Sequence, residues 1–146
     1  MIKQNEAYLV VINNRQEWDK TLKELACHDC YHTYDYHQLN KSKNEKVILL
    51  KYVQADILIC MPLIISKIDG TPYFDATSVY GYAGPIQKNV SSDFDNTFFC
   101  EIITEFFLKE NIIAVFSRLN PFINYQKAVI KNLGTITTLE SVVNIN

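Results

Sequence analysis

Residues 47–65 read VILLKYVQADILICMPLII, two runs of aliphatic and β-branched residues on either side of a short polar segment. Runs of this composition favour strands, and the polar residues 54–56 between them suit a hairpin turn. Pro62 has no backbone N–H to donate, which predicts an edge position or a bulge in the second run. The stretch therefore predicts an antiparallel hairpin at the centre of a sheet.

The hairpin is expected to continue into a third strand. Asp69 and Gly70 form the strongest hairpin-turn signal in the chain, so residues 72–76 should return beside the second run. Further along, residues 91–93, SSD, predict the N-cap of one long amphipathic helix. Its apolar residues follow helical spacing, and such an aromatic stripe is typical of core packing. The stripe comprises Phe94, Phe98, Ile102, Ile103, Phe106 and Phe107.

The outer segments complete the order of elements. Further helices are predicted over residues 16–27, 35–40 and 125–133, the last closed by Gly134. Further strands are predicted over residues 7–12, 112–116, 135–139 and 142–145, of which 112–116 should be buried. Strands that follow one another through short turns favour an α+β fold, with a mixed, mostly antiparallel sheet flanked by helices.

Length and composition are those of an ordinary globular protein. The 146 residues suit one domain, residues 1–146, and the 48% hydrophobic and 21% charged residues argue against disorder. The formal net charge is −2, and the lysines and arginines are scattered. This pattern argues against a surface that coats DNA or a basic membrane patch. A local basic pocket for one phosphate group stays open.

The sequence shows no targeting segment and no membrane span. Residues 1–6 are mostly polar, and no apolar run reaches the ~20 residues that cross a bilayer. We therefore expect a cytoplasmic protein whose four cysteines are reduced thiols. Cys60 and Cys100 lie within apolar runs, which predicts that both are buried as small hydrophobic residues.

A segment rich in cysteine and histidine, residues 27–32, reads CHDCYH and is followed by His37. Its C-x-x-C spacing with neighbouring imidazoles is that of zinc ligands, and a redox dithiol is a second option. A tetrahedral site needs another pair of ligands, for which His37 is the only candidate. Ordinary residues at a helix end are the favoured interpretation, so we expect no metal site.

A segment rich in glycine and tyrosine, residues 75–86, reads DATSVYGYAGPI. Gly81 and Gly84 permit backbone geometry that other residues resist, and they let a ligand or another strand approach closely. One interpretation is a kinked strand that directs the chain toward the long helix. The other is a platform on which Tyr80, Tyr82 and backbone amides line a cleft.

Two further segments have both a structural and a functional interpretation. Arg118 leaves an apolar strand, where it could offer a forked donor to a carboxylate or phosphate, or pair with Asp75 or a backbone carbonyl. Residues 31–37, YHTYDYH, join the first two helices. They form either a capping loop with Asp35 at the N-cap or one wall of a substrate pocket.

Three of these segments together resemble a known family. Residues 30–37, 73–86 and 112–121, in this order, look like the N-terminal lobe of FemAB-like transferases. Those proteins are relatives of the GCN5-related N-acetyltransferases and act in cell-wall and surface-polysaccharide synthesis. The resemblance covers residues 7–146, and the tyrosine and glycine segment is its most specific part. Where the family often has histidine, this sequence has Asn120.

The resemblance implies an acyl-CoA N-acyltransferase-like fold and a two-lobed protein. Donor and acceptor then meet in a cleft, and this chain corresponds to the N-terminal half. The implied donor is acyl-CoA or an aminoacyl-tRNA, and the implied acceptor is an amine on a small molecule or glycan precursor. The chain lacks the Q/R-x-x-G-x-G/A loop that would hold a pyrophosphate at a helix N-terminus, so we expect no cofactor bound by this lobe.

The resemblance also selects substrate-binding residues, although it offers no convincing general base and hence no catalytic residue. They are Tyr36, His37, Tyr80, Gly81, Tyr82, Gly84 and Arg118. Tyr80 and Tyr82 would form hydrogen bonds in the cleft, and the two glycines would allow a close approach. Arg118 would hold an anionic group, and Tyr36 or His37 would line the rim. The alternative is a non-catalytic binding or assembly module, whose exposed apolar surface is covered by a missing C-terminal lobe or by a homodimer.

Overall fold

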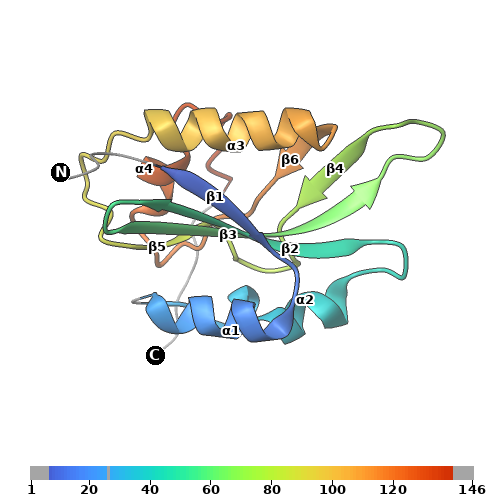
Figure 1. Ribbon diagram of the computed structural model, residues 1–146, viewed down its shortest axis with the longest axis horizontal. Helices are drawn as coiled ribbons and strands as arrows, with labels where there is room; N and C mark the ends of the chain where they lie inside the picture. The colour runs from blue at the N-terminus through green and yellow to red at the C-terminus, as the bar shows by residue number, and fades with distance from the viewer. Residues whose placement is uncertain (1–6, 26, 140–146) are drawn as a thin grey trace.

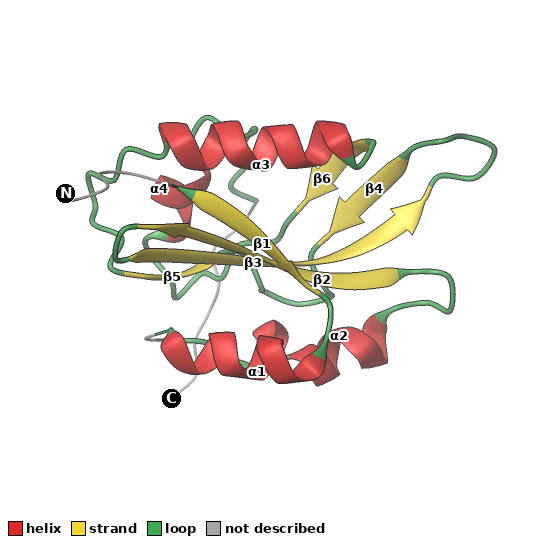
Figure 2. Cartoon of the chain, in the orientation of Figure 1, coloured by secondary structure: helices red, strands yellow, loops and turns green. Residues whose placement is uncertain are grey.

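The structure is a computed structural model that describes residues 7–25 and 27–139. One sheet lies between helices on its two faces, in three layers (Figures 1 and 2). The strands are β1 (Tyr8–Ile12), β2 (Lys46–Gln54), β3 (Ile57–Lys67), β4 (Phe74–Thr77), β5 (Ile86–Lys88) and β6 (Ile112–Phe116). The helices are α1 (Arg15–Glu24), the 3-10 turn η1 (Cys30–His32), α2 (Tyr34–Asn40), α3 (Thr97–Lys109) and α4 (Gln126–Ile130). The predicted α+β class with a mixed, mostly antiparallel sheet is confirmed.

The sheet is built around the predicted hairpin. β2 pairs antiparallel with β3 from Lys46 opposite Ile65 to Gln54 opposite Ile57. Ala55 takes the left-handed conformation, with a φ of 52°, so a two-residue turn joins the strands. The described strand order is β1-β2-β3-β4-β6, with β5 also on β3. The hairpin and its turn are therefore confirmed.

Pro62 lies in the middle of β3, at a place where one side of that strand has no partner. β2 runs past it on one side, with Leu49 opposite. On the other side β5 pairs with residues 58–60 and β4 with residues 64–67, so residues 61–63 lie between the two. A missing N–H is tolerated in such a gap. The expected edge position is confirmed for this part of β3, because Pro62 has a partner strand on one side only. No bulge interrupts its pairing with β2.

β6 is parallel to β4, and α3 makes the crossover between them. The predicted strand over residues 112–116 is confirmed, but the expectation that it is buried is wrong. Only Ile112 is buried, whereas Ile113 is 62% and Phe116 59% exposed. The reason is position, because β6 pairs with β4 on one side and ends the described sheet on the other.

The strands alternate between two hydrophobic cores. Leu49 and Cys60 face α1, whose Trp18 is fully buried. Leu50 and Ile59 face α3 and α4 on the other side of the sheet. This alternation follows from the two-residue repeat of a strand, and both faces are apolar because both are covered by helices.

All four cysteines are free thiols. Cys60 is buried as predicted, and its burial raises the pKa of the thiol to about 12. Cys100 is only half-buried, because it lies on the side of α3 where Lys131 O accepts a hydrogen bond from its thiol. Cys27 and Cys30 are exposed.

Both N-terminal helices form, with corrected ends. The Asn14 side chain accepts a hydrogen bond from the Glu17 N–H at 3.0 Å, so α1 begins one residue earlier than predicted, and it ends three residues earlier. α2 is capped by Thr33, whose Oγ1 accepts from the Tyr36 N–H at 3.3 Å. Asp35 is therefore not the cap. It lies in the first turn and is hydrogen-bonded to Arg15.

α3 begins later than predicted. Residues 91–94 form a separate turn, in which the Phe94 N–H donates to Ser91 O at 3.2 Å, so residues 91–93 do not cap the helix. The helix begins at Thr97, whose N–H donates to Asp95 Oδ1 at 3.0 Å. The aromatic stripe does pack in the core, where Ile103 is fully buried and Ile102, Phe106 and Phe107 are partly buried. Phe99, which the predicted stripe does not include, is also buried there. Phe94 lies outside the helix, and Phe98 is 49% exposed.

The C-terminal segment departs most from expectation. α4 spans only five residues and ends at Ile130, so Gly134 does not close it. Asn132, with a φ of 67°, takes the left-handed conformation there. Residues 135–139 form no strand, and the strand predicted over residues 142–145 lies outside the described residues. Among the described helices, none has the length and apolar character needed to cross a bilayer.

Candidate functional site

Three segments that are far apart in the sequence meet at the backbone carbonyl of Ala83. His32 Nε2 and Gln126 Nε2 both donate to this oxygen, each at 2.9 Å. Gln126 Nε2 also donates to Pro85 O at 2.9 Å. The linker before α2, the loop after β4 and the start of α4 are thereby joined.

Asn120 extends this polar network. Its backbone N–H donates to Gln126 Oε1 at 2.6 Å, and its side-chain amide donates to Asp29 Oδ2 at 3.0 Å and to Tyr82 O at 3.3 Å. Asn120 is 9% and Gln126 1% exposed. Because buried polar groups are costly unless they are paired, this network fixes the loop that carries Tyr80 and Tyr82.

His32 is a structural member of the network. Its Nδ1 accepts the Asp29 N–H at 3.1 Å, so Nε2 carries the proton that is donated to Ala83 O. Burial lowers the pKa of His32, although the neighbouring Asp29 carboxylate acts in the opposite direction. Both ring nitrogens are engaged and the side chain is fully buried, so His32 has no free nitrogen to offer a substrate.

The two glycines of the loop are approached closely, but by side chains of the chain itself. A Cβ on Gly81, whose φ is 116°, would lie 2.3 Å from the Tyr31 ring. A Cβ on Gly84, whose φ is 67°, would lie 2.6 Å from the Gln126 amide. Close approach, as expected from the sequence, is therefore used for packing the loop in this structure.

Of the other predicted binding residues in this region, Tyr36 and Tyr82 lie near the surface, whereas His37 lies in the core. Tyr31 packs edge-to-face against Tyr36 and Tyr82, with ring centroids 5.4 and 6.3 Å apart. Tyr82 is 42% exposed, and Tyr36 is half-buried. His37 is fully buried beside Trp18, so it lies in the core rather than at a rim. Its burial lowers the pKa of the imidazole to about 4.

A separate pocket of about 230 Å³ lies where β4 and β6 end side by side. It is lined by Thr77, Ser78, Val79, Tyr80, Phe116 and Arg118. Two hydrogen bonds hold the two strand ends together. The Ser78 N–H donates to Phe116 O at 2.8 Å, and the Arg118 N–H donates to Ser78 Oγ at 3.0 Å.

Arg118 and Tyr80 meet in this pocket. The guanidinium carbon of Arg118 lies 5.4 Å from the centre of the Tyr80 ring and 6.0 Å from that of Phe116. No ion pair within the described part of the chain involves Arg118, and the expected alternative partner, Asp75, does not bind it. The stacked guanidinium thus keeps its N–H donors available for a carboxylate or phosphate.

Sequence reasoning missed two contributors to this region. Gln126 holds the loop after β4. The sequence does contain a signal for this role, because Gln126 is a polar residue on a helix face that also carries the apolar Val129 and Ile130. Ser78 joins the two strand ends, and nothing in its sequence context distinguishes it. Both ring nitrogens of His32 are engaged, and no cluster of three or more potential metal ligands occurs in residues 7–25 and 27–139.

The chain was compared with known proteins at three levels. No protein-family model matches it, and neither a curated protein nor a solved structure is a match. The pocket geometry and the fold therefore carry the functional argument.

Proposed function

We propose that this chain is the acceptor-side lobe of a FemAB-like acyl- or aminoacyl-transferase, and that Arg118 holds an anionic group of the acceptor. The single observation that carries the proposal is the pocket at the ends of β4 and β6, in which Arg118 stacks on Tyr80. Parallel strands joined by a crossover helix place their carboxyl ends together, and such ends are the usual place for ligands in open sheets. An anionic substrate is the class that the pocket suits.

The order of elements supports the same proposal. One strand, two α-helices, three strands in antiparallel succession, the short strand β5, a long helix and a parallel strand follow one another. Apart from β5, this is the order that the resemblance to acyl-CoA N-acyltransferases implies. In that class of reaction an amine attacks an activated acyl carbonyl, and much of the rate comes from holding the two groups together. Thr77, Ser78 and Tyr80 add hydroxyl groups beside Arg118 that orient the acceptor.

Binding of inorganic pyrophosphate and of an amino-sugar nucleotide diphosphate tests the proposal, with Kd measured by NMR titration. Arg118→Ala should weaken both at least about tenfold, because a charge-assisted hydrogen bond contributes about 1.5–3 kcal/mol. Arg15→Ala is the matched control, since Arg15 also lies over a tyrosine ring, that of Tyr34, far from the pocket along the chain. Equal affinity in wild type and Arg118→Ala would refute the role of Arg118.

Transfer itself is measured as release of thiol from an acyl thioester in the presence of the amino-sugar nucleotide. Release that depends on both substrates and falls in Arg118→Ala supports the transferase. Tight binding of the nucleotide without release of thiol would support the pocket as a binding site. It would also argue against catalysis by this lobe alone.

A second candidate function is favoured by the exposed apolar side chains of β6. Ile113 is 62%, Val115 39% and Phe116 59% exposed, in a strand that pairs on one side only among the strands of residues 7–25 and 27–139. Such an edge is a template for pairing with another strand, so the lobe is suited to self-association or assembly. Sedimentation of wild type and Ile113→Lys distinguishes it: the substitution should favour the monomer, whereas Val10→Lys, at the opposite edge in β1, should not. A monomeric wild type at high concentration would exclude this candidate.

A further inference from the structure

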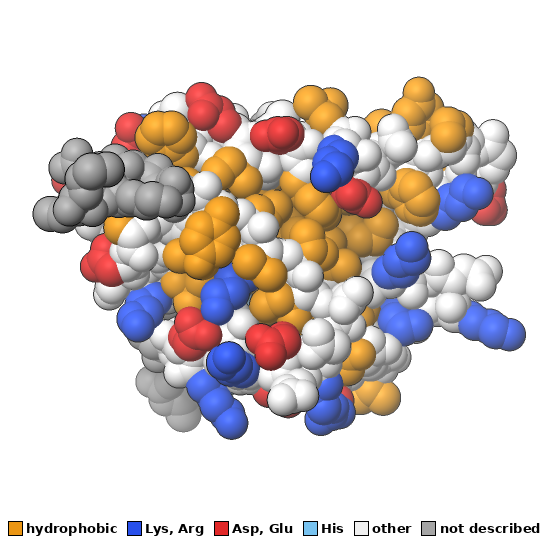
Figure 3. Space-filling model, in the orientation of Figure 1, with side chains coloured by type: hydrophobic (Ala, Val, Ile, Leu, Met, Phe, Trp, Pro, Cys, Tyr) orange, Lys and Arg blue, Asp and Glu red, His pale blue; other side chains and the backbone are white. Residues whose placement is uncertain are grey.

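A second hollow lies at the opposite end of β4 from Arg118, under the C-terminal end of α3. Figure 3 shows hydrophobic side chains gathered in a hollow beneath this helix, with charged side chains around them. The groove has a volume of about 250 Å³. Its walls are apolar and its rim is charged. They are formed by Val11, Asn44, Lys46, Ile48, Ile65, Lys67, Phe74, Phe106, Glu110 and Ile112.

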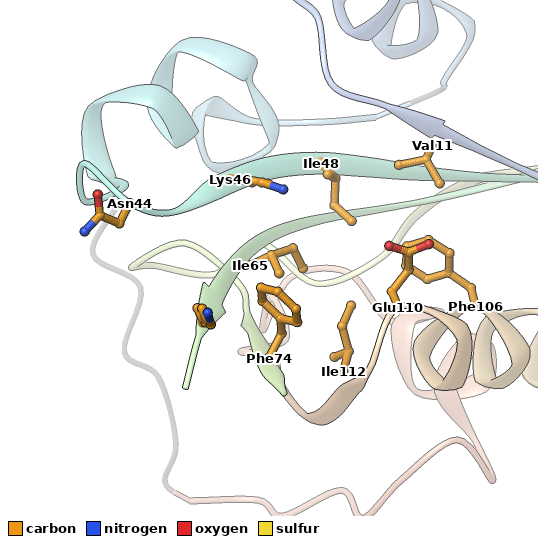
Figure 4. A pocket seen from close by; sticks show the side chains of 10 residues that line it. Val11, Asn44, Lys46, Ile48, Ile65, Phe74, Phe106, Glu110 and Ile112 are labelled. Carbon is orange, nitrogen blue, oxygen red and sulfur yellow. The ribbon is translucent and has the colours of Figure 1, made fainter. Parts of the chain in front are cut away.

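The groove exists because the helix stops before the sheet does. α3 ends at Lys109, and Asn111 takes the left-handed conformation, with a φ of 55°. The chain therefore turns at once into β6 and does not cover the beginning of β2 and the end of β3. Phe106 and Glu110, one helical turn apart, form the wall on the helix side, and Ile48, Ile65, Phe74 and Ile112 form the floor (Figure 4).

The charges at the rim point to one class of ligand. Lys46 lies opposite Ile65, and Lys67 is two residues further along β3, so both lysines lie on the same face as the floor. Diagonal neighbours of this kind are about 7–8 Å apart, and like charges on such neighbours repel each other. No ion pair between described residues involves Lys46, Lys67 or Glu110. A single anionic group placed between the ammonium groups would relieve the repulsion.

We propose that this groove binds a small amphiphile that has an unbranched apolar chain and one carboxylate, such as a medium-chain fatty acid. The chain lies on the isoleucine and phenylalanine floor, and the carboxylate lies at Lys46 and Lys67. Glu110, on the helix side of the groove, repels a second negative charge. The groove should therefore bind a monocarboxylate in preference to a diphosphate. The site is independent of the transferase proposal, because it shares no lining residue with the Arg118 pocket.

Titration of the isotope-labelled chain with hexanoate, octanoate and decanoate tests the site, observed through the methyl groups of Ile48, Ile65 and Ile112. Shifts should concentrate in these methyl groups. The Kd should fall about fourfold for each added methylene, as expected for burial of an apolar chain, until the chain outgrows the groove. The absence of methyl shifts in the groove would refute the proposal.

The charge requirement is tested with Lys46→Gln combined with Lys67→Gln, which keeps both positions polar. The double variant should bind octanoate about fivefold more weakly and bind octanol as the wild type does, because only the carboxylate is recognised by charge. Lys23→Gln, on α1 at the opposite face of the sheet, is the matched control. Equal binding of octanol and octanoate by the wild type, or an unchanged octanoate Kd in the double variant, would overturn the assignment.

Discussion

His37 is the residue whose environment differs most from what the sequence suggests. A histidine in an aromatic linker is expected at a surface, yet its ring lies 5.2 Å from that of Trp18 and is fully buried. Its Nδ1–H donates to Thr33 O at 2.9 Å, and Nε2 has no hydrogen-bond partner among the described residues. A buried imidazole with one free nitrogen resists protonation.

This burial predicts acid sensitivity. Desolvation lowers the pKa of His37 from 6.5 to about 4, so the unfolded chain binds a proton at a higher pH than the folded chain. Stability is therefore complete above pH 6.5 and falls as the pH drops toward 4, by about 3 kcal/mol from this residue. Urea unfolding at pH 7.0, 5.5 and 4.5 should show the loss, and His37→Gln should reduce it. His32, whose pKa is also lowered, adds a loss in the same direction that this variant keeps.

The glycines predict a graded series of stabilities. Gly84→Ala combines a positive φ of 67° with a clash against Gln126, and should cost more than about 2 kcal/mol. Gly70→Ala has a φ of 72° but open space, so it should cost about 1 kcal/mol. Gly134→Ala has neither feature and should be close to neutral. Free energies of unfolding in urea that did not follow this order would contradict the assigned role of Gly84.

At the scale of elements, the start of α3 shows what a sequence pattern can and cannot specify. The serines before Phe94 are good capping residues, but the Asn96 side chain makes contacts across the chain that a local pattern does not contain. Its amide donates to Val129 O at 2.9 Å and is also hydrogen-bonded to Lys131 O. Asn96 thus ties the first turn of α3 to the end of α4.

Asn96→Ala should therefore destabilise the protein by about 1–3 kcal/mol, the range for leaving a buried carbonyl without its donor. Ser92→Ala, in the exposed turn before the helix, should have little effect on the unfolding free energy. Hydrogen exchange of the amides in α4 distinguishes a local effect, because Asn96→Ala should raise their exchange rates. If both variants unfolded at the same urea concentration, the stabilising role assigned to the Asn96 side chain would be contradicted.

Much of the sheet could be predicted because its strands are long, apolar and joined by strong turn signals. The hairpin of β2 and β3 and the turn at Ala55 follow from such local information. The exposure of β6 could not be predicted, since an apolar run looks the same whether or not a further strand covers it. The pocket was predicted in part: Arg118 and Tyr80 were identified, but their meeting depends on the parallel pairing of β4 with β6. The Gln126 network depends on contacts between residues about 40 positions apart.

At the scale of the whole molecule, the two hydrophobic cores share the same strands. Leu49 and Leu50 are neighbours in β2, and they face α1 and α3 respectively. A strand cannot lose its packing on one face without weakening the other, so the three layers should unfold as one cooperative unit. Trp18, the sole tryptophan, reports on the α1 core alone, since it is fully buried there.

Asn96→Ala perturbs the α3 and α4 side of the sheet, yet it should lower the urea midpoint of Trp18 fluorescence as much as that of far-ultraviolet circular dichroism. The two midpoints should shift equally because the cores share strands. Once α3 and α4 unfold, the α1 core has no stable sheet to pack against. Trp18 fluorescence that kept the wild-type midpoint while the dichroism signal fell early would mean that the α1 layer and the sheet persist without α3. The sheet would then be stable with one helical layer, and the two cores would have to be treated as separate folding units.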